Sequence, residues 1–376
     1  MDFRLYFRSR QGEMVHLLKQ LVSLESPTDD KKAVDDCSAF AVREFRKLGC
    51  KITTLPQKDI GDLTVIEYAP GRTKSADDEI LVLTHIDTVW PAGKIARMPF
   101  YISGDKLFGP GALDMKCGLA MLVSALAAMR SLSLKPQKRI TIFINSAEET
   151  GHSAAHDVIR RLAKRSSLVL CLEPALPGGA LKLERKGRLV LRLDVRGRAA
   201  HGGTPEKGVN AIEELAAQIQ RLKKLRTGET TVNVGMAAGG DKANIVPESA
   251  WALLDVRFWK VLDREKIMGT VREMKPVLHG AKLKFSVQSA MPPMEKTKAS
   301  ARLFSQAAEI AGSIGLTLKG GKTGGGSDAS IAAGLGIPTL DGLGPDGDGI
   351  HADNEHLLLS SFVERTALLT RLLTDL

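Results

Sequence analysis

Residues of the types that bind metal ions stand shortly after three apolar segments of the chain, which end at Leu83, Ile144 and Leu172. These residues are His85, Asp87, Glu148, Glu149 and Glu173. In open α/β sheets, ligands gather at the carboxyl ends of the strands, so we expect these side chains to reach one edge of a sheet. Neighbouring carboxylates repel one another unless a cation or a proton neutralises them. Histidine and carboxylate without cysteine suit a hydrolytic zinc, manganese or cobalt site.

Two further candidate ligands, Asp114 and His351, lie outside these segments. Asp114 closes the segment 109–114 just before a predicted helix, and His351 lies in the Gly/Asp-rich loop 347–351. Each candidate taken alone is more often structural, so the prediction depends on their convergence. Because two metal ions a few ångströms apart can hold a hydroxide and polarise a carbonyl, the pattern favours hydrolysis.

Other catalytic patterns fit the chain less well. Gly321-Lys322-Thr323 resembles the end of a phosphate-binding loop, but Leu316 stands where that loop requires glycine. The chain contains neither a GxSxG nucleophile elbow nor an HExxH helix. The segment 323–328 is glycine-rich and opens a predicted helix, so its N–H groups could bind a carboxylate or an oxyanion. A flexible turn explains this segment equally well.

The elements that must position these residues follow an alternating pattern. Buried strands are expected at 80–83, 140–144 and 168–172, and shorter ones at 51–55 and 63–68. Helices are expected at 11–24, 34–48, 117–130, 153–163, 298–313 and 359–374. Strands that alternate with helices indicate an α/β domain with a mostly parallel sheet. We assign residues 1–186 and 294–376 to this catalytic, metal-binding domain.

The middle of the chain follows a different pattern. Residues 188–196 alternate apolar and charged side chains, which indicates a strand with one buried face. A helix starting near Asn210, strands at 230–236 and 250–258, a helix at 262–274 and a strand at 282–288 complete the order βαββαβ. This order is typical of a ferredoxin-like α+β domain. We therefore predict an inserted domain at 187–293.

Composition argues against two other classes of protein. The net charge is +10, but the basic residues are spread out and aromatic residues make up only 5%, which speaks against nucleic-acid binding. No apolar run approaches the roughly 18 residues of a membrane helix. The segment 1–10 lacks the apolar stretch of a signal peptide, so we expect a cytoplasmic protein. The four cysteines form no CxxC pair, which makes a cysteine-ligated zinc site improbable.

Three motifs together resemble one known family. Residues 83–89 resemble its HxDTV motif, residues 109–116 its GxGxxDxK motif, and residues 146–151 its xEExG motif. The family is that of the aminoacylase-type co-catalytic zinc metallopeptidases, which includes glutamate carboxypeptidase, acetylornithine deacetylase and succinyl-diaminopimelate desuccinylase. The resemblance extends over about 12–375. The segments 244–247 and 323–329 also match the bacterial glutamate carboxypeptidase.

This resemblance implies a pair of divalent metal ions, preferably zinc, with cobalt and manganese as alternatives. Asp114 would bridge the two ions. His85 and Glu173 would complete one coordination sphere, and Glu149 and His351 the other. The resemblance also implies a cis peptide bond after the bridging aspartate.

The same resemblance assigns roles in catalysis. Glu148 would be the general base that takes a proton from metal-bound water and passes it to the leaving nitrogen. Asp87 would orient the imidazole of His85. The domain at 187–293 would be a lid through which two copies form a homodimer. His201 would reach the site of the partner subunit and stabilise the oxyanion.

Substrate recognition is the least determined part of the resemblance. Asn244 and Arg257 would hold the substrate, since arginine suits a terminal carboxylate, and we add Gly324, Gly325 and Gly326 as candidate contacts. A small peptide or an N-acyl amino acid is the expected substrate, and a glutamate-releasing exopeptidase is the leading function. An N-acyl-amino-acid deacylase or desuccinylase is the alternative. A metal-binding protein without activity is a third hypothesis, against which Glu148 argues, because a binding site needs no extra base.

Overall fold

The computed structural model describes residues 2–69 and 78–376. By its internal contacts the chain divides into two compact units. The larger unit consists of Met1–Leu183, Lys296–Lys322 and Ser327–Leu376, and the smaller unit consists of Glu184–Glu295 and Thr323–Gly326. Each unit has its own hydrophobic core.

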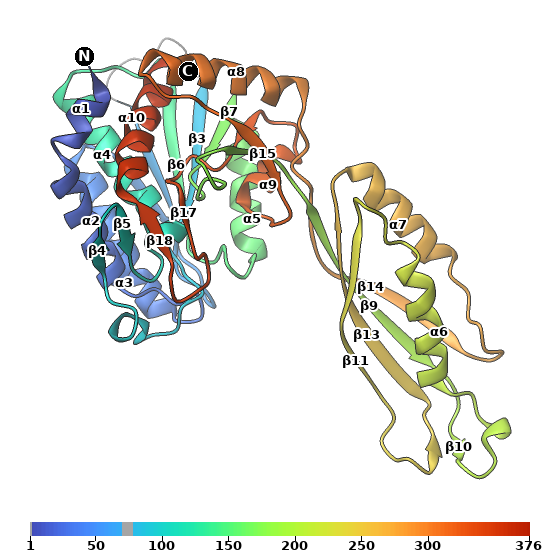
Figure 1. Ribbon diagram of the computed structural model, residues 1–376. Helices are drawn as coiled ribbons and strands as arrows, with labels where there is room; N and C mark the ends of the chain where they lie inside the picture. The colour runs from blue at the N-terminus through green and yellow to red at the C-terminus, as the bar shows by residue number, and fades with distance from the viewer. Residues whose placement is uncertain (1, 70–77) are drawn as a thin grey trace. The chain divides into compact units, whose positions relative to one another are not determined.

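The larger unit is built on a six-stranded sheet with the order β1-β2-β6-β3-β7-β16 (Figure 1). These strands are β1 (Lys51–Leu55), β2 (Leu63–Tyr68), β3 (Glu79–His85), β6 (Arg139–Asn145), β7 (Leu168–Cys171) and β16 (Thr339–Leu340). The pairs β6–β3, β3–β7 and β7–β16 are parallel, and β1 and β2 are antiparallel to their neighbours. Every residue of β3 is buried, as expected for a central parallel strand. The predicted mostly parallel sheet is confirmed.

Helices cover both faces of this sheet. Figure 1 shows α4 and α10 on one side and α5 and α9 on the other. The helices of the larger unit are α1 (Phe3–Arg8), α2 (Gln11–Ser23), α3 (Lys31–Lys47), α4 (Cys117–Ser131), α5 (Ser153–Ala163), α8 (Lys298–Ser313), α9 (Asp328–Ala333) and α10 (Leu359–Asp375). The sequence analysis predicted the long helices and missed α1. Its six residues are too few to repeat the apolar spacing of a helix.

The sequence analysis found no apolar run as long as a membrane helix, but the described residues include a helical stretch of that length. The helical stretch Ala112–Ser131 is long and apolar enough to cross a membrane by length and composition alone. Within its most apolar window, 83% of the residues are buried inside the protein. A core helix that is covered on all sides passes the same test, since such a helix is apolar around its whole circumference.

A second, small sheet in the larger unit has the order β17-β18-β5-β4. Its strands are β4 (Tyr101–Ser103), β5 (Lys106–Phe108), β17 (Gly347–Asp348) and β18 (His356–Leu358). The pairing of His356 with Phe108 holds the loop before β18 beside the segment that follows β5. This sheet therefore brings His351 and Asp114 into the same region. Short helical turns, η1 (Lys94–Ala96) and the π-helical η2 (Ala112–Lys116), complete the unit.

The smaller unit contains a four-stranded antiparallel sheet with the order β11-β13-β9-β14. Its elements are β9 (Gly187–Arg196), β10 (Ala200–His201), η3 (Pro205–Lys207), α6 (Ala211–Lys223), β11 (Thr231–Gly239), β12 (Ile245–Val246), β13 (Ser249–Phe258), α7 (Val261–Glu273) and β14 (Lys282–Met291). Strand β13 alternates buried and half-buried residues along its length, so one face of the sheet packs under α6 and α7. The order of the main elements is βαββαβ.

The chain passes between the two units near residues 183 and 322, and these stretches bear on the predicted sites. Strands β8 (Leu181–Arg185) and β15 (Gly320–Thr323) form a two-stranded sheet, and the amide of Lys186 donates to the carbonyl of Thr323. The glycine-rich segment Thr323–Gly326 therefore belongs to the smaller unit. The predicted role of 187–293 as a lid and dimerisation domain stays a prediction.

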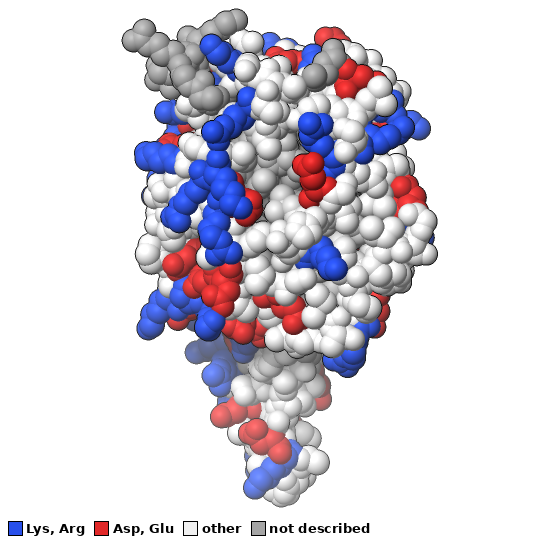
Figure 2. Space-filling view, turned by 90° about the vertical axis from the view of Figure 1, so that its left-hand side faces the viewer, with Lys and Arg blue, Asp and Glu red and all other residues white. Residues whose placement is uncertain are grey.

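Some of the basic residues form ion pairs with acidic residues on the surface. Figure 2 shows Lys and Arg side chains beside Asp and Glu side chains on one face of the molecule. On α3, Lys31 pairs with Asp35 and Lys32 with Asp36, in each case one helical turn along the chain.

Candidate metal centre

His85 stands at the end of β3 and is fixed at both ring nitrogens. Its Nδ1 lies 3.0 Å from the carbonyl oxygen of Asp87 and 3.4 Å from Oδ1 of the same residue. Its Nε2 points the other way and lies 3.3 Å from Oδ1 of Asp114. A partner at Nδ1 sets the tautomer that presents Nε2 to a metal ion, and Asp87 is the partner here.

Asp87 also orders the loop that carries two glutamates. Its buried carboxylate accepts hydrogen bonds from the amides of Glu148 (3.1 Å) and Glu149 (3.2 Å) and from the hydroxyl of Thr28 (2.8 Å). One side chain therefore ties the end of β3 to the loop after β6. This tie exists because β3 and β6 are parallel neighbours, which end at the same edge of the sheet.

Asp114 offers its two carboxylate oxygens to two different histidines. Oδ1 faces Nε2 of His85 at 3.3 Å, and Oδ2 faces Nε2 of His351 at 3.4 Å. Burial raises the pKa of Asp114, but hydrogen bonds from His351 and His85 outweigh it and hold that pKa below its ordinary value. A carboxylate with one oxygen toward each of two histidines suits a residue that bridges two ions. The peptide bond between Asp114 and Met115 is cis, as the resemblance implies.

His351 completes the second half of the cluster. Its Nε2 lies 3.3 Å from Oε2 of Glu149, and its backbone is left-handed, with a φ of 61°. The hydrogen bonds that His351 donates to the carboxylates of Asp114 and Glu149 raise the pKa of His351 to about 10. Few residues other than glycine adopt this backbone conformation, and it is concentrated at functional sites.

Glu173 and Glu148 lie on the His85 side of the cluster. Oε1 of Glu173 lies 3.7 Å from Nε2 of His85, and Nζ of Lys182 lies 4.0 Å from the other carboxylate oxygen. Ligand atoms of His85, Glu148 and Glu173 all lie within 4.8 Å of one another. Burial, and then the charge of Glu173, hold the pKa of Glu148 well above its ordinary value.

The residues present fit a centre for divalent cations. A second set of donors, in His85, Asp114 and Glu149, also lies within 4.8 Å. Among the residues that the structure describes, the buried Oε1 of Glu149 has no hydrogen-bond partner. A buried carboxylate oxygen without a partner is costly unless a cation binds it. The histidine and carboxylate donors suit zinc, manganese or cobalt, and the geometry does not choose among these ions.

Two residues near the glutamate loop were missed by the sequence analysis. Asn145 at the end of β6 accepts a hydrogen bond from the amide of Ala147 and donates one, 2.7 Å long, to Oδ2 of Asp328. Burial raises the pKa of Asp328 to about 6, although the hydrogen bond from Asn145 lowers it. The position of Asn145 at a strand end was a usable signal, whereas Asp328 lies 183 residues further along the chain.

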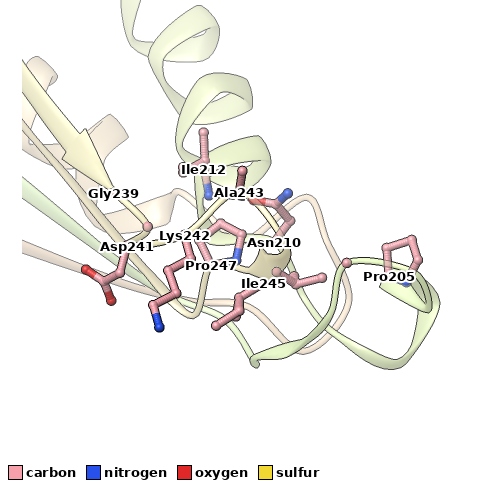
Figure 3. Close-up of a pocket in the computed structure, with 12 residues that line it drawn as sticks. Pro205, Asn210, Ile212, Gly239, Asp241, Lys242, Ala243, Ile245 and Pro247 are labelled. Carbon is pink, nitrogen blue, oxygen red and sulfur yellow. Dashed lines mark hydrogen bonds between the residues drawn. The ribbon is translucent and has the colours of Figure 1, made fainter.

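The predicted substrate residues form two groups within the smaller unit. His201 and Asn244 are neighbours, because His201 pairs with Ile245 across β10 and β12 and the amide of Gly202 donates to the carbonyl of Asn244. Both residues are exposed. A pocket of about 520 Å³ lies beside them, between the start of α6 and the loop 239–247 (Figure 3).

The second group joins Arg257 to the glycine-rich segment. Nη1 of Arg257 donates to the carbonyl of Gly324 at 2.9 Å, and its Nε lies 3.0 Å from Oδ1 of Asp255. Arg185 donates to the carbonyls of Gly325 and Gly326. These contacts use the carbonyl oxygens of the segment, whereas the sequence analysis proposed its N–H groups as the binding groups.

Comparison with known proteins identifies the family. The sequence profile described as Peptidase family M20/M25/M40 matches residues 81–375. The chain belongs to this family. Carboxypeptidase G2 of Pseudomonas sp. (strain RS-16) is 31% identical to it over 378 residues, which cover 97% of this chain and 90% of the relative. The M20 chain is thus a hydrolytic enzyme of the metallopeptidase or amidohydrolase type.

Solved structures support the fold of this M20 protein. Aminopeptidase PepT of Bacillus cereus matches with a TM-score of 0.80 and 24% identity, over 96% of this chain and 98% of that one. The YXEP protein of Bacillus subtilis, described as a dinuclear metal binding peptidase of the M20 family, matches with a TM-score of 0.71 and 13% identity, over 97% of this chain and 98% of that one. At these identities the matches show the fold alone.

Proposed function

We propose that this M20 enzyme is a carboxypeptidase that removes a C-terminal amino acid, preferably glutamate, with two divalent metal ions, zinc first among them. The observation that carries the proposal is the pair of contacts from Asp114 to His85 and His351, with Glu148 beside them. The similarity to carboxypeptidase G2, which extends over nearly the whole chain, supports the choice of the C-terminal end.

The ligands proposed for the two ions divide at Asp114. His85 and Glu173 would hold one ion, Glu149 and His351 would hold the other, and Asp114 would contact both. Metal ions bound there would polarise the carbonyl of the scissile amide and make water a nucleophile at neutral pH.

Glu148 is the proposed general base. Its amide is held by Asp87, while burial and the charge of Glu173 raise its pKa. A carboxyl group whose pKa is raised toward neutrality can accept a proton from water and donate it to the leaving nitrogen. Asp87 holds the imidazole of His85 and the loop of Glu148 at once, so it fixes the base relative to a ligand.

Arg257 is the proposed carboxylate-binding residue. Its contacts with Asp255 and Gly324 fix the guanidinium in one orientation, and a fixed guanidinium binds a carboxylate with little loss of side-chain entropy. Asn244 and His201 would contact the substrate amide, with His201 supplied by a partner subunit.

Hydrolysis assays test this proposal. Dipeptides and N-acyl amino acids with C-terminal glutamate, N-acetylornithine, N-succinyl-diaminopimelate and an N-terminally free tripeptide would be compared, with and without added zinc. Release of C-terminal glutamate at the highest kcat/KM, dependent on metal, is expected. A preference for the ornithine or diaminopimelate compounds would replace the proposal with a deacylase or desuccinylase, and removal of the N-terminal residue would replace it with an aminopeptidase. A Glu148→Gln variant is the control for contaminating peptidases.

A further inference from the structure

Glu355 is a buried carboxylate that lies next to the candidate metal centre. It is 1% exposed and stands between His351 and the first residue of β18. The pairing of β18 with β5 places it beside the segment 109–114. A buried, ionisable side chain in such a place needs partners, since an unpaired buried charge is strongly destabilising.

Four N–H groups donate to this carboxylate, two to each oxygen. Oε1 accepts from the amides of Leu113 (2.9 Å) and Asp114 (3.1 Å). Oε2 accepts from the amide of Gly111 (3.0 Å) and from Nε1 of Trp90 (2.8 Å). Both carboxylate oxygens of Glu355 are thus hydrogen-bonded, and the donors belong to two other segments of the chain.

These contacts connect three segments that carry metal-ligand candidates. The amides of Gly111, Leu113 and Asp114 belong to the segment of Asp114. Trp90 directly follows the motif 83–89, which contains His85. Glu355 itself closes the loop of His351, because its own amide donates to the carbonyl of Ala352.

A second contact reinforces the same connection. Lys94 pairs with Asp353, and its Nζ lies 4.4 Å from the centre of the Trp90 ring. The segment 90–94 and the loop 351–355 are therefore joined at two points. Apart from the contact between the side chains of His351 and Asp114, the bonds to Glu355 are the hydrogen bonds between the His351 loop and the segment 111–114 among the residues described.

We infer that Glu355 is a positioning residue that sets the geometry of the metal centre by tying the segments of His85, Asp114 and His351 together. The inference rests on the proposed function, since it assumes that these three residues bind metal. Glu355 contacts the backbone of Asp114 and not the reacting atoms. Its effect is therefore expected on metal affinity before it appears in turnover.

The substitution Glu355→Gln tests the inference with little change in volume. An amide has one oxygen, so whichever way it is turned, two of the four N–H donors face its NH2 group. The loss of a group that orients metal ligands typically weakens metal binding about 10–100-fold. Zinc affinity would be measured by isothermal titration calorimetry with a competing chelator, and thermal unfolding of the metal-free protein would be measured in parallel.

Glu214→Gln is the matched control. Glu214 is also buried, with 0% exposed, and accepts from the amides of Val277 and Leu278 and from the side chain of Gln218. It belongs to the smaller unit, which holds none of the proposed ligands. Both variants should unfold at a lower temperature than the wild type, but only Glu355→Gln should bind zinc more weakly.

Activity against zinc concentration gives a second readout. The Glu355→Gln enzyme should need at least about ten times more free zinc for half-maximal activity and recover at saturating zinc, whereas Glu214→Gln should keep the wild-type midpoint. If Glu355→Gln does not fold, Trp90→Phe removes one donor and keeps an aromatic ring under Lys94, and a smaller weakening of zinc binding is expected.

The outcomes separate this inference from the proposed function. A wild-type protein that binds no divalent metal would refute both. If the wild type binds two ions and Glu355→Gln binds zinc with unchanged affinity, the positioning role alone is refuted. Where Glu355→Gln does not fold, unchanged zinc affinity in Trp90→Phe refutes it in the same way.

Discussion

Asp114 is the residue on which the two halves of the candidate centre meet. Its oxygens face His85 and His351 at nearly equal distances of 3.3 and 3.4 Å. Asp114→Asn replaces one oxygen with an NH2 group and removes the charge, so it should weaken the binding of both ions and not only one. Metal content after dialysis against buffered zinc measures this, and Asp36→Asn on the exposed face of α3 is the control. Two equivalents retained by Asp114→Asn would contradict the bridging role.

Glu148 differs from its neighbour Glu149 in its proposed role, and a pair of variants separates them. Glu148→Gln should keep two metal equivalents and lose about 10²–10⁴-fold in kcat, the usual contribution of a general base. Glu149→Gln should lose metal together with activity, because Glu149 pairs with His351 at 3.3 Å. The comparison requires kcat at saturating zinc and metal analysis of both proteins. A Glu148→Gln enzyme with near-normal kcat would remove the base from the mechanism.

The sequence contains enough information to find most of the cluster but not its surroundings. His85, Glu148, Glu149 and Glu173 follow apolar runs, and strand ends can be located from such runs. Asp328 and Glu355 carry no such signal, because each reaches the site through contacts with residues more than a hundred positions away in the chain. The positions of these two side chains near the cluster depend on topology, which periodicity alone does not determine.

At the level of elements, the sequence predicts the long strands but not the short ones. The buried runs of β3, β6 and β7 are four to seven residues long and predict their own strands. Strands β4, β5, β17 and β18 have only two or three residues, too few to show a period of two. This small sheet nevertheless holds the His351 loop, so the least predictable element supports one of the candidate ligands.

Strands β9 and β13 carry a matched pair of arginines for testing substrate recognition. Arg257 and Arg188 both bind Asp255, but only Arg257 also contacts Gly324. Arg257→Lys keeps the charge and loses the planar donor pair, so KM for C-terminal glutamate substrates should rise about 10-fold or more with kcat less affected. Arg188→Lys should leave KM near that of the wild type. Equal effects of the two substitutions would assign Arg257 a structural role only.

At the scale of the whole molecule, the proposed ligands and the proposed oxyanion donor are in different units. All five ligands belong to the larger unit, whereas His201 belongs to the smaller one. The smaller unit also exposes apolar side chains at Ile212, Met236 and Ile245. We propose that two copies associate through this unit and that His201 of each copy serves the other copy's metal centre. An isologous contact of this kind supplies two equivalent sites.

Subunit complementation tests this arrangement. His201→Ala should lose about 10²–10³-fold in kcat, the usual cost of one oxyanion donor, and Glu148→Ala should be almost inactive. When the two proteins are mixed and their subunits exchange, each mixed dimer contains one site with both groups intact. Activity should therefore return to about half of the wild-type value per mixed dimer, since one of its two sites works. Exchange would be verified with differently tagged subunits, and each variant mixed with itself is the control. If verified mixed dimers stay inactive, His201 does not act across the interface.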